Sequence, residues 1–255
     1  MEDTDMRHIL RLAVSVACVY MAAASGDTTP GLPEYHAPFT ATPPVIDGRL
    51  DDEAWAKAPA ATLIFPIQDQ TGPETRTTIR IVWDSQHLFL AYDCEDADIT
   101  ALHDKRDAPV YEHDCVEVFI TPGPESHGLY YGLEMSAAAV FYDYLFVHHA
   151  EAGRPIINQF DLAGVRLATH LRGTLNAHGD QDDGWSLEVA IPYASMADLG
   201  AAPESCDTWR IQLNRWEGSE PHRRLSMWSA PSDNPPLEPP HDPPRFGLLH
   251  FTKAP

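Results

Sequence analysis

The residues best suited to chemistry lie on strand-like segments whose side chains alternate between two faces. In Cys115–Ile120 every second residue is branched and apolar, which leaves Glu117 and Phe119 together on the opposite face. A carboxylate inside an otherwise apolar strand needs partners, because burial of an uncompensated charge is costly. Glu117 is therefore a candidate ligand-binding residue, and Tyr111 lies shortly before it in the chain.

Two further segments add polar groups of the same kind. The segment Tyr130–Ser136 carries Glu134 on its polar face, and one face of Trp209–Trp216 carries Arg210, Gln212, Asn214 and Trp216. These groups supply the directional donors and acceptors that sugar hydroxyls require, and an aromatic ring suits the apolar face of a sugar. The pattern favours a carbohydrate site, and a solvated sheet face without a ligand is the alternative.

An enzymatic alternative depends on paired carboxylates. Glycosidases use two carboxyl groups about 5 to 9 Å apart, and the chain has 38 acidic residues, so candidate pairs are plentiful. Glu117 with Glu134 is the pair to test in a glycoside hydrolase. The sequence contains no G-x-S-x-G, H-E-x-x-H or P-loop motif. We therefore expect a binding protein and assign no catalytic residue.

Metal and thiol chemistry are open questions in the sequence. Four acidic residues gather in one short stretch and could hold a structural Ca²⁺, or form an ordinary acidic turn: Asp93, Glu95, Asp96 and Asp98. No C-x-x-C pair occurs. Cys94 and Cys115 could form a disulfide or remain free buried thiols, and Cys206 is the other cysteine beyond the N-terminal region. The sequence requires no cofactor and assigns no metal ligand.

The elements that must position these residues are strands. Period-two alternation predicts strands over 77–83, 87–92, 116–120, 130–136, 140–146, 185–191, 209–213 and 246–251. The first two form an expected hairpin, and so do 130–136 and 140–146. A short helix is expected over Asp51–Ala58, capped by Asp51 or Asp52, and another after Pro192. Many short alternating strands predict an all-β, jelly-roll-like antiparallel β-sandwich in a single domain.

Composition limits the partners. The formal net charge is −21, with 17 basic residues, so we expect neither nucleic acid nor an anionic membrane surface as a ligand. Residues 231–244 contain seven prolines, which excludes a central strand there and favours a stiff loop draped over the domain.

The N-terminus resembles an export signal. Arg7 and Arg11 precede an apolar run, Leu12–Ala24, that is too short to span a bilayer. We expect a signal peptide over 1–26, a linker over 27–43 and the domain over 44–253, in a protein that is secreted, periplasmic or at the cell surface. A buried N-terminal helix is the alternative, and no membrane insertion is expected after removal of the leader.

Five runs in order are similar to carbohydrate-binding module family 9 and its stand-alone relatives. The first is the opening VIDGRLDDEAW at Val45–Trp55, and the second is the hairpin with VWD and LFLA at Val82–Ala91. The others are YEHDCVEVFI at Tyr111–Ile120, GWSLEVAIP at Gly184–Pro192, and the closing WS and RFGLL within Trp228–Leu249. The resemblance covers roughly residues 43–252. It implies a jelly-roll-like β-sandwich that binds sugars, notably polysaccharide chain ends, between two aromatic rings.

By motif position, the resemblance assigns the two rings to Tyr111 and Trp228 and a hydrogen-bonding carboxylate to Glu117. Family members that bind sugar have an arginine on the strand where this chain has Glu134, so the donor set differs here. The expected role is carbohydrate binding in support of polysaccharide catabolism, with any catalysis supplied by a separate glycoside hydrolase. A haem-binding sandwich is a further alternative, because related folds hold haem through methionine and histidine and this chain has Met135.

Overall fold

The computed structural model describes residues 31–67, 70, 74–125, 128–149, 154–219, 221–233 and 239–253. The expected signal peptide, residues 1–26, lies outside these residues. No helix in the described residues is long and apolar enough to cross a membrane.

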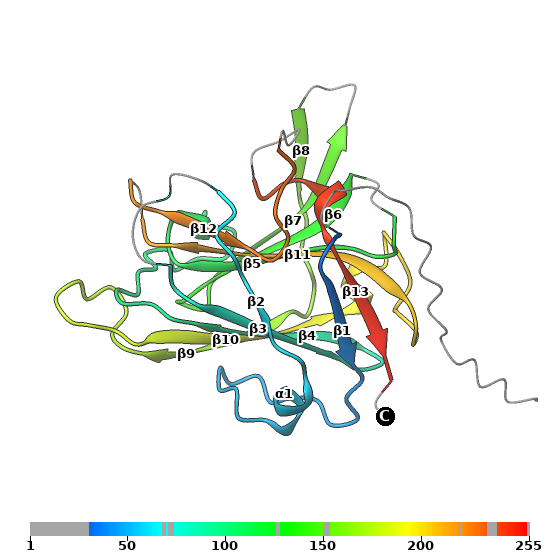
Figure 1. The fold of residues 1–255 in the computed structure, drawn as a ribbon, viewed down its shortest axis with the longest axis horizontal. Helices are drawn as coiled ribbons and strands as arrows, with labels where there is room; N and C mark the ends of the chain where they lie inside the picture. Colours follow the sequence, from blue (N-terminus) through cyan, green and yellow to red (C-terminus); the bar gives the residue numbers. More distant parts are fainter. Residues whose placement is uncertain are drawn as a thin grey trace, which may run out of the picture. The chain divides into compact units, whose positions relative to one another are not determined.

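Two β-sheets form the described part of the chain (Figure 1). The eight-stranded sheet has the order β1 (Glu34–Pro38), β13 (Gly247–Thr252), β11 (Thr208–Glu217), β5 (Cys115–Thr121), β6 (Leu129–Ser136), β7 (Phe141–His149) and β8 (Arg154–Gln159), with β12 (Arg224–Met227) also paired to β11. The five-stranded sheet has the order β2 (Ala61–Thr62), β3 (Thr77–Trp83), β4 (His87–Cys94), β10 (Gly184–Pro192) and β9 (Arg166–Arg172). The expected β-sandwich is confirmed.

The core lies between the two sheets and follows the period-two pattern. Alternate residues of β5, β10 and β11 are buried there, among them Val118, Leu187 and Leu213. Both expected hairpins are present as antiparallel pairs, β3 with β4 and β6 with β7. Because one face of each strand enters this core, Glu117 and Glu134 necessarily lie on the opposite face of their sheet.

Part of the segment that was expected to be a linker, residues 27–43, forms strand β1. Glu34–Pro38 forms an edge strand that pairs in parallel with β13, with His36 opposite His250. The sheet is therefore not wholly antiparallel. Tyr35 fixes the strand to the core, since its hydroxyl accepts a hydrogen bond from the backbone N–H of Ile81 at 2.8 Å.

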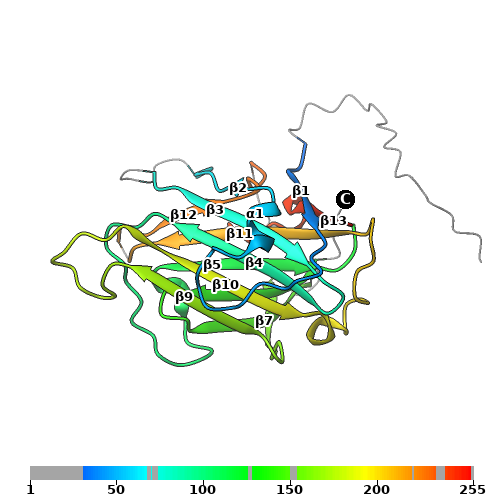
Figure 2. The ribbon, with the colours of Figure 1, turned by 90° about the horizontal axis from the view of Figure 1, so that it is seen from below.

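The short helix expected over Asp51–Ala58 is present as α1 (Glu53–Lys57), on the outer side of the five-stranded sheet (Figure 2). Asp52 occupies the N-cap, but its side chain accepts from the Val45 N–H instead of capping the helix. A short 3₁₀ helix, Tyr193–Met196, follows Pro192 as expected.

Glu188 on β10 fastens this N-terminal segment to the sheet. Its Oε1 accepts from the Trp55 indole at 2.6 Å, and its Oε2 accepts from the backbone N–H groups of Asp47 and Gly48 at 2.9 and 2.7 Å. Gly48 has φ +86, and a Cβ there would lie 2.4 Å from the Thr169 backbone. Only glycine allows this close approach.

A buried ion pair connects the two sheets. Arg215 of β11 points into the core, where it donates to Asp96 at 3.0 Å and to Thr77 at 3.1 Å. The Trp185 indole donates to the same Asp96 carboxylate at 3.1 Å. Because an unpaired buried charge is costly, these bonds fix the relation of β11 to the five-stranded sheet.

The cysteines do not form the disulfide considered from the sequence. Cys94 and Cys115 are buried free thiols, and Cys206 is exposed. Cys94 ends β4 and Cys115 begins β5, so the two belong to different sheets. Burial raises the pKa of the Cys94 thiol to about 12, which leaves it protonated and inert.

The substitution Glu188→Gln is expected to destabilise the fold by about 1–3 kcal/mol, because an amide cannot accept all three hydrogen bonds and leaves a buried donor unpaired. Urea unfolding followed by tryptophan fluorescence measures the change. Glu53→Gln, on α1 with an 81% exposed side chain, is the matched control and should change stability by less than about 0.5 kcal/mol. Equal effects of the two substitutions would contradict the anchoring role of Glu188.

Candidate functional site

The outer face of the eight-stranded sheet, which is turned away from the five-stranded sheet, gathers most of the predicted site residues. Strand register aligns one row across β11, β5, β6 and β7: Asn214, Glu117, Glu134 and Tyr142. The next row along the strands is Gln212, Phe119, Gly132 and Tyr144. We call the first set the outer row.

Glu117 lies at the centre of the outer row. Its side chain is buried and accepts a hydrogen bond from the Asn214 amide at 3.1 Å. Burial raises the pKa of Glu117 to about 7, while hydrogen bonds from Asn214 and Trp216 and the charge of Arg223 act in the opposite direction. The carboxyl group is therefore poised between its neutral and charged forms near neutral pH.

Glu134 faces Glu117 from the neighbouring strand and is also buried. Burial raises the pKa of Glu134 well above its ordinary value, and the negative charge of Glu117 raises it further, while Tyr144 and Arg223 lower it. Two facing carboxyl groups in an apolar setting cannot both ionise at low cost. The pair therefore favours retention of one proton, and the stronger upward shift favours Glu134 as the group that carries it.

Three buried polar atoms on this face have no hydrogen-bond partner of standard geometry among the described residues. They are the Asn214 Oδ1, the Glu134 Oε2 and the Tyr144 hydroxyl. Buried polar groups are nearly always satisfied in native proteins, so such atoms call for a ligand or water. The three belong to adjacent rows on neighbouring strands and together offer acceptors and donors to a single bound molecule.

Trp216, Arg223 and Tyr111 lie at the rim beside the outer row. The Arg223 guanidinium lies 4.1 Å from the centre of the Trp216 ring, and it donates to the Tyr111 backbone carbonyl at 2.6 Å. Tyr111 has a 37% exposed side chain on the 3₁₀ turn Val110–Glu112, which packs against β6. Tyr111 is thus exposed near the carboxylates, and Trp216 is partly exposed with Arg223 over one face of its ring.

The opposite end of the outer face is covered by the proline-rich segment. His241 stacks on Phe119 and Phe146 with ring centroids 5.2 and 5.3 Å apart, and the Tyr130 hydroxyl bonds its Nδ1 at 2.5 Å. Burial lowers the pKa of His241 to about 4, so its ring is neutral at pH 7. The described part of the loop, from residue 239 onward, therefore drapes over the domain as the sequence predicts.

Two predicted site residues bind the backbone on either side of this covering segment. The Gln212 amide donates to the Ser229 carbonyl at 2.8 Å and accepts from the Ser229 N–H at 3.1 Å. Arg210 donates to the carbonyls of Pro124 and Phe246 at 2.8 and 3.1 Å. Both side chains face the outer side, but their hydrogen bonds go to the protein backbone.

Trp228 is not placed opposite Tyr111. It is 9% exposed and belongs to the core cluster between the sheets. Its ring lies where a Cβ on Gly247 would point, at 2.3 Å, and Gly247 pairs with Ile211, a core residue of β11. The aromatic pair expected from the family resemblance is therefore not formed, and Trp216 is the tryptophan that lies on the outer face.

In the described structure, each acidic residue of the stretch considered for Ca²⁺ lies beside a different basic residue. Asp93 pairs with Arg172, Glu95 with Arg76, Asp96 with Arg215 and Asp98 with His178. Met135, considered for haem, is fully buried in the core between the sheets, where it faces Val116 in the strand register.

Sequence reasoning missed several residues of the outer face. Tyr142 and Tyr144 lie on a predicted strand, and their alternation with core residues was a usable signal. Arg223 and His241 lie in loops, where no periodicity marks them.

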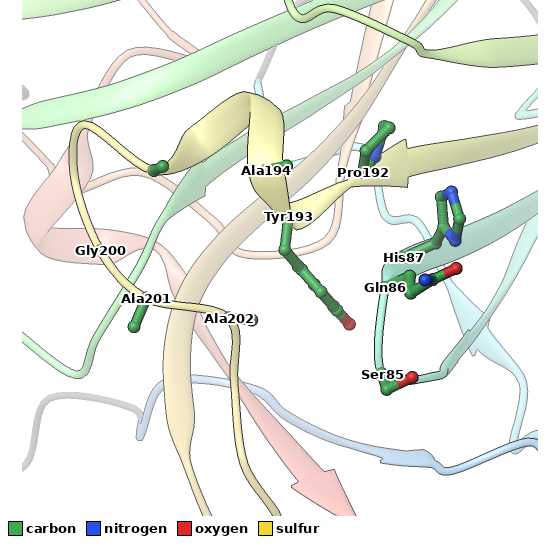
Figure 3. Close-up of a pocket in the computed structure, with 10 residues that line it drawn as sticks. Ser85, Gln86, His87, Pro192, Tyr193, Ala194, Gly200, Ala201 and Ala202 are labelled. Carbon is green, nitrogen blue, oxygen red and sulfur yellow. The ribbon is translucent and has the colours of Figure 1, made fainter.

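A separate hollow of about 460 Å³ lies at the beginning of β4 and the end of β10 (Figure 3). Tyr193 projects between Gln86 on one side and Ala202 on the other. The Tyr193 hydroxyl is buried and has no hydrogen-bond partner in the described chain. The hollow is lined mostly by small and apolar residues and has no carboxylate, so it offers fewer polar groups to a ligand than the outer row does.

Three solved structures share the fold. A candidate carbohydrate-binding protein from Bacteroides uniformis is 19% identical, with a TM-score of 0.70 over 86% of this chain and 98% of that chain. A carbohydrate-binding module family 9 protein from Caldicellulosiruptor kristjanssonii, in complex with cellotriose, is 15% identical, with a TM-score of 0.58 over 88% and 95%. The same kind of module from that organism, in complex with glucose, has a TM-score of 0.56, 15% identity and coverage of 88% and 97%.

No curated protein matches the chain. The family model for carbohydrate family 9 binding domain-like proteins matches residues 46–254. This range includes every strand of the described structure except β1 and contains the outer row and its rim. The chain belongs to the carbohydrate family 9 binding domain-like family.

Proposed function

We propose that this protein binds a mono- or oligosaccharide, such as the chain end of a polysaccharide, on the outer face of its eight-stranded sheet. The observation that carries the proposal is a cluster of buried polar atoms without a hydrogen bond of standard geometry, on Asn214, Glu134 and Tyr144, beside the Glu117 carboxyl group. Glu134 and Tyr144 interact with each other, and among the described residues the Asn214 Oδ1 is left without a protein donor. Sugar hydroxyls both donate and accept, so one pyranose could satisfy several of these atoms at once. Related modules in complex with glucose and cellotriose support the same ligand class.

With a proton on Glu134, the site contains both a hydrogen-bond donor and hydrogen-bond acceptors. Protonated Glu134 donates, whereas ionised Glu117 accepts, and the free Oδ1 of Asn214 accepts. A site built on such groups discriminates strongly against an analogue that lacks the matching hydroxyl, because the buried groups are then left unpaired.

Aromatic contact is assigned to Tyr111 and Trp216. Tyr111 is the exposed ring at the rim, and Trp216 shares the outer face with Asn214 on the same strand. A sugar stacked on either ring would lie beside Arg223, whose charge already acts on both carboxyl groups. Arg223 thus offers from a loop the guanidinium that the family places on the strand of Glu134.

A glycoside hydrolase is the second candidate, because Glu117 and Glu134 face each other on adjacent strands. Directly opposed side chains have Cβ atoms about 4.5–5.5 Å apart, which is compatible with the spacing of a retaining pair. The raised pKa of both groups does not separate the two functions, because one protonated and one ionised carboxyl group is also the state that a retaining pair requires. Turnover of chromogenic glycosides, abolished by Glu117→Gln, would favour the enzyme.

The proposal includes export. The apolar run Leu12–Ala24 behind basic residues is typical of a leader, and an exported binding protein would hold a glycan near the cell for a separate hydrolase in polysaccharide catabolism.

Calorimetric titration of the protein with glucose, cello-oligosaccharides and a wider sugar panel should reveal a ligand whose affinity depends on the outer face. Asn214→Ala, Tyr111→Ala and Trp216→Ala are each expected to weaken binding by about 10-fold or more, since each removes a polar or stacking contact of about 1–3 kcal/mol.

Tyr193→Phe is the matched control, because it removes the unpartnered hydroxyl of the other hollow and leaves the outer face intact. It should bind as the unsubstituted protein does. Loss of affinity in Tyr193→Phe with no change in the three outer-face variants would contradict the proposed site.

Stability should depend on pH through Glu134. Its folded pKa lies above its unfolded value, so the folded chain keeps a proton that the unfolded chain releases. The bound proton contributes to the free energy of unfolding, and this contribution is fully present below about pH 4.3, the ordinary pKa of glutamate. It is lost as the pH rises from there toward the folded pKa, by about 1.4 kcal/mol per pH unit. Glu134→Gln, which is neutral at every pH, should therefore be more stable than the unsubstituted protein at pH 8 and gain little at pH 5.

Thermal unfolding of both proteins across this range measures the difference, with the exposed Glu204→Gln as control. A gain from Glu134→Gln that is equal at both pH values would show that Glu134 does not hold a proton.

A further inference from the structure

Three side chains that commonly bind metal ions converge at the rim of the outer face. His103, Glu112 and His113 each offer a ligand atom, and these atoms all lie within 4.8 Å of one another. The His103 Nε2 and a Glu112 carboxylate oxygen are 3.1 Å apart. Ligands on one tetrahedral ion are about 3.4 Å apart at the usual bond lengths, so small side-chain rotations would close the set.

The backbone holds these residues in place. The loop that carries them is closed at its base, where the Asp114 N–H donates to the Thr100 carbonyl at 3.0 Å and the Thr100 N–H donates to the Asp114 carboxylate at 2.7 Å. Within the loop, buried Val110 anchors the 3₁₀ turn that ends at Glu112. The ligand atoms therefore project from a fixed frame.

His113 is oriented by a second contact. Its Nδ1 lies 2.9 Å from the Ser219 hydroxyl. Histidine ligands of metal ions commonly use one ring nitrogen for the ion and the other for such an orienting hydrogen bond. This contact leaves the His113 Nε2 as its ligand atom.

We propose that His103, Glu112 and His113 form a binding site for a divalent transition-metal ion of the zinc class. Two imidazoles and one carboxylate are a known ligand set for such ions, and three protein ligands leave a coordination position for water or another molecule. The site adjoins Tyr111, but it does not depend on sugar binding.

Two other ligand sets in the described residues are less suitable. His36 and His250 stack with an interplanar angle of 19° and centroids 4.7 Å apart. Nitrogen lone pairs lie in the ring plane, so nearly parallel stacked rings do not aim at one ion. His103 and His113 are tilted by 35°, which lets their ring planes meet.

The second alternative is acidic and already neutralised. In the set of Asp107, Asp143 and Asp161, the Arg106 guanidinium lies 2.8 Å from Asp143 and 3.0 Å from Asp161. A bound cation would have to displace that arginine.

Calorimetric titration of the chelator-treated full chain with Zn²⁺ tests the proposal. We expect one specific ion per chain, with affinity reduced about 100-fold or more in His103→Ala/His113→Ala. The matched control, His36→Ala/His250→Ala, removes the same number of histidines and should keep the affinity. Ser219→Ala should weaken binding about 10-fold through loss of the orienting contact.

Unfolding temperature provides a second readout, because an ion that binds only the folded chain raises it. Zn²⁺ should raise the unfolding temperature of the unsubstituted protein and of the control, but not that of His103→Ala/His113→Ala. If that double variant folds poorly without metal, Glu112→Gln, with a 52% exposed side chain, gives the same comparison. Equal Zn²⁺ affinity in the variants and the unsubstituted protein, or loss in the control alone, would overturn the proposal.

Discussion

The burial of two facing carboxyl groups, Glu117 and Glu134, is the constraint on which the outer face depends. Each lies on a strand whose other face fills the core, so neither can turn away from its neighbour. Their coexistence depends on a retained proton, on the Asn214 amide and on the nearby charge of Arg223. An arrangement this costly is unusual in a merely structural sheet face, and perturbed buried acids of this kind concentrate at functional sites.

The outer face is divided into a closed and an open part. At the closed part, His241 and the aromatic residues beneath it form a stacked cluster, and Gln212 binds Ser229, just before the covering segment, to β11. At the open part, Tyr111 and Trp216 flank the carboxyl groups. This division supports the proposed chain-end ligand, because the covering segment limits how far along the sheet a ligand could extend.

Period-two alternation was sufficient to predict that Glu117, Glu134 and Asn214 lie on outward faces, because the side chain period of a strand leaves no other choice. It could not predict that the three lie in one row, since register depends on which strands pair. Trp228 was assigned to the site by its position in the family motif and not by alternation, whereas the structure places its ring in the core cluster. It follows the last residue of β12, where the chain leaves the sheet and alternation no longer determines the side.

The sequence motifs of the family divide between scaffold and site. The opening and GWSLEVAIP runs meet through Glu188, Trp55 and Gly48, so in this chain they pack the N-terminal segment against the five-stranded sheet. β1 escaped prediction because its short, proline-flanked sequence resembles a linker and its partner β13 is distant in the chain. The composition of a short segment does not indicate which distant strand it pairs with.

A crystal structure of the protein with the tightest-binding oligosaccharide tests the central claim most directly. The account predicts a sugar ring over Glu117, Glu134 and Asn214, beside Tyr111 and Trp216, with hydroxyls within hydrogen-bond distance of the Asn214 Oδ1 and the Glu134 Oε2. A sugar bound in the hollow beside Tyr193, or anywhere away from the outer row, would contradict it.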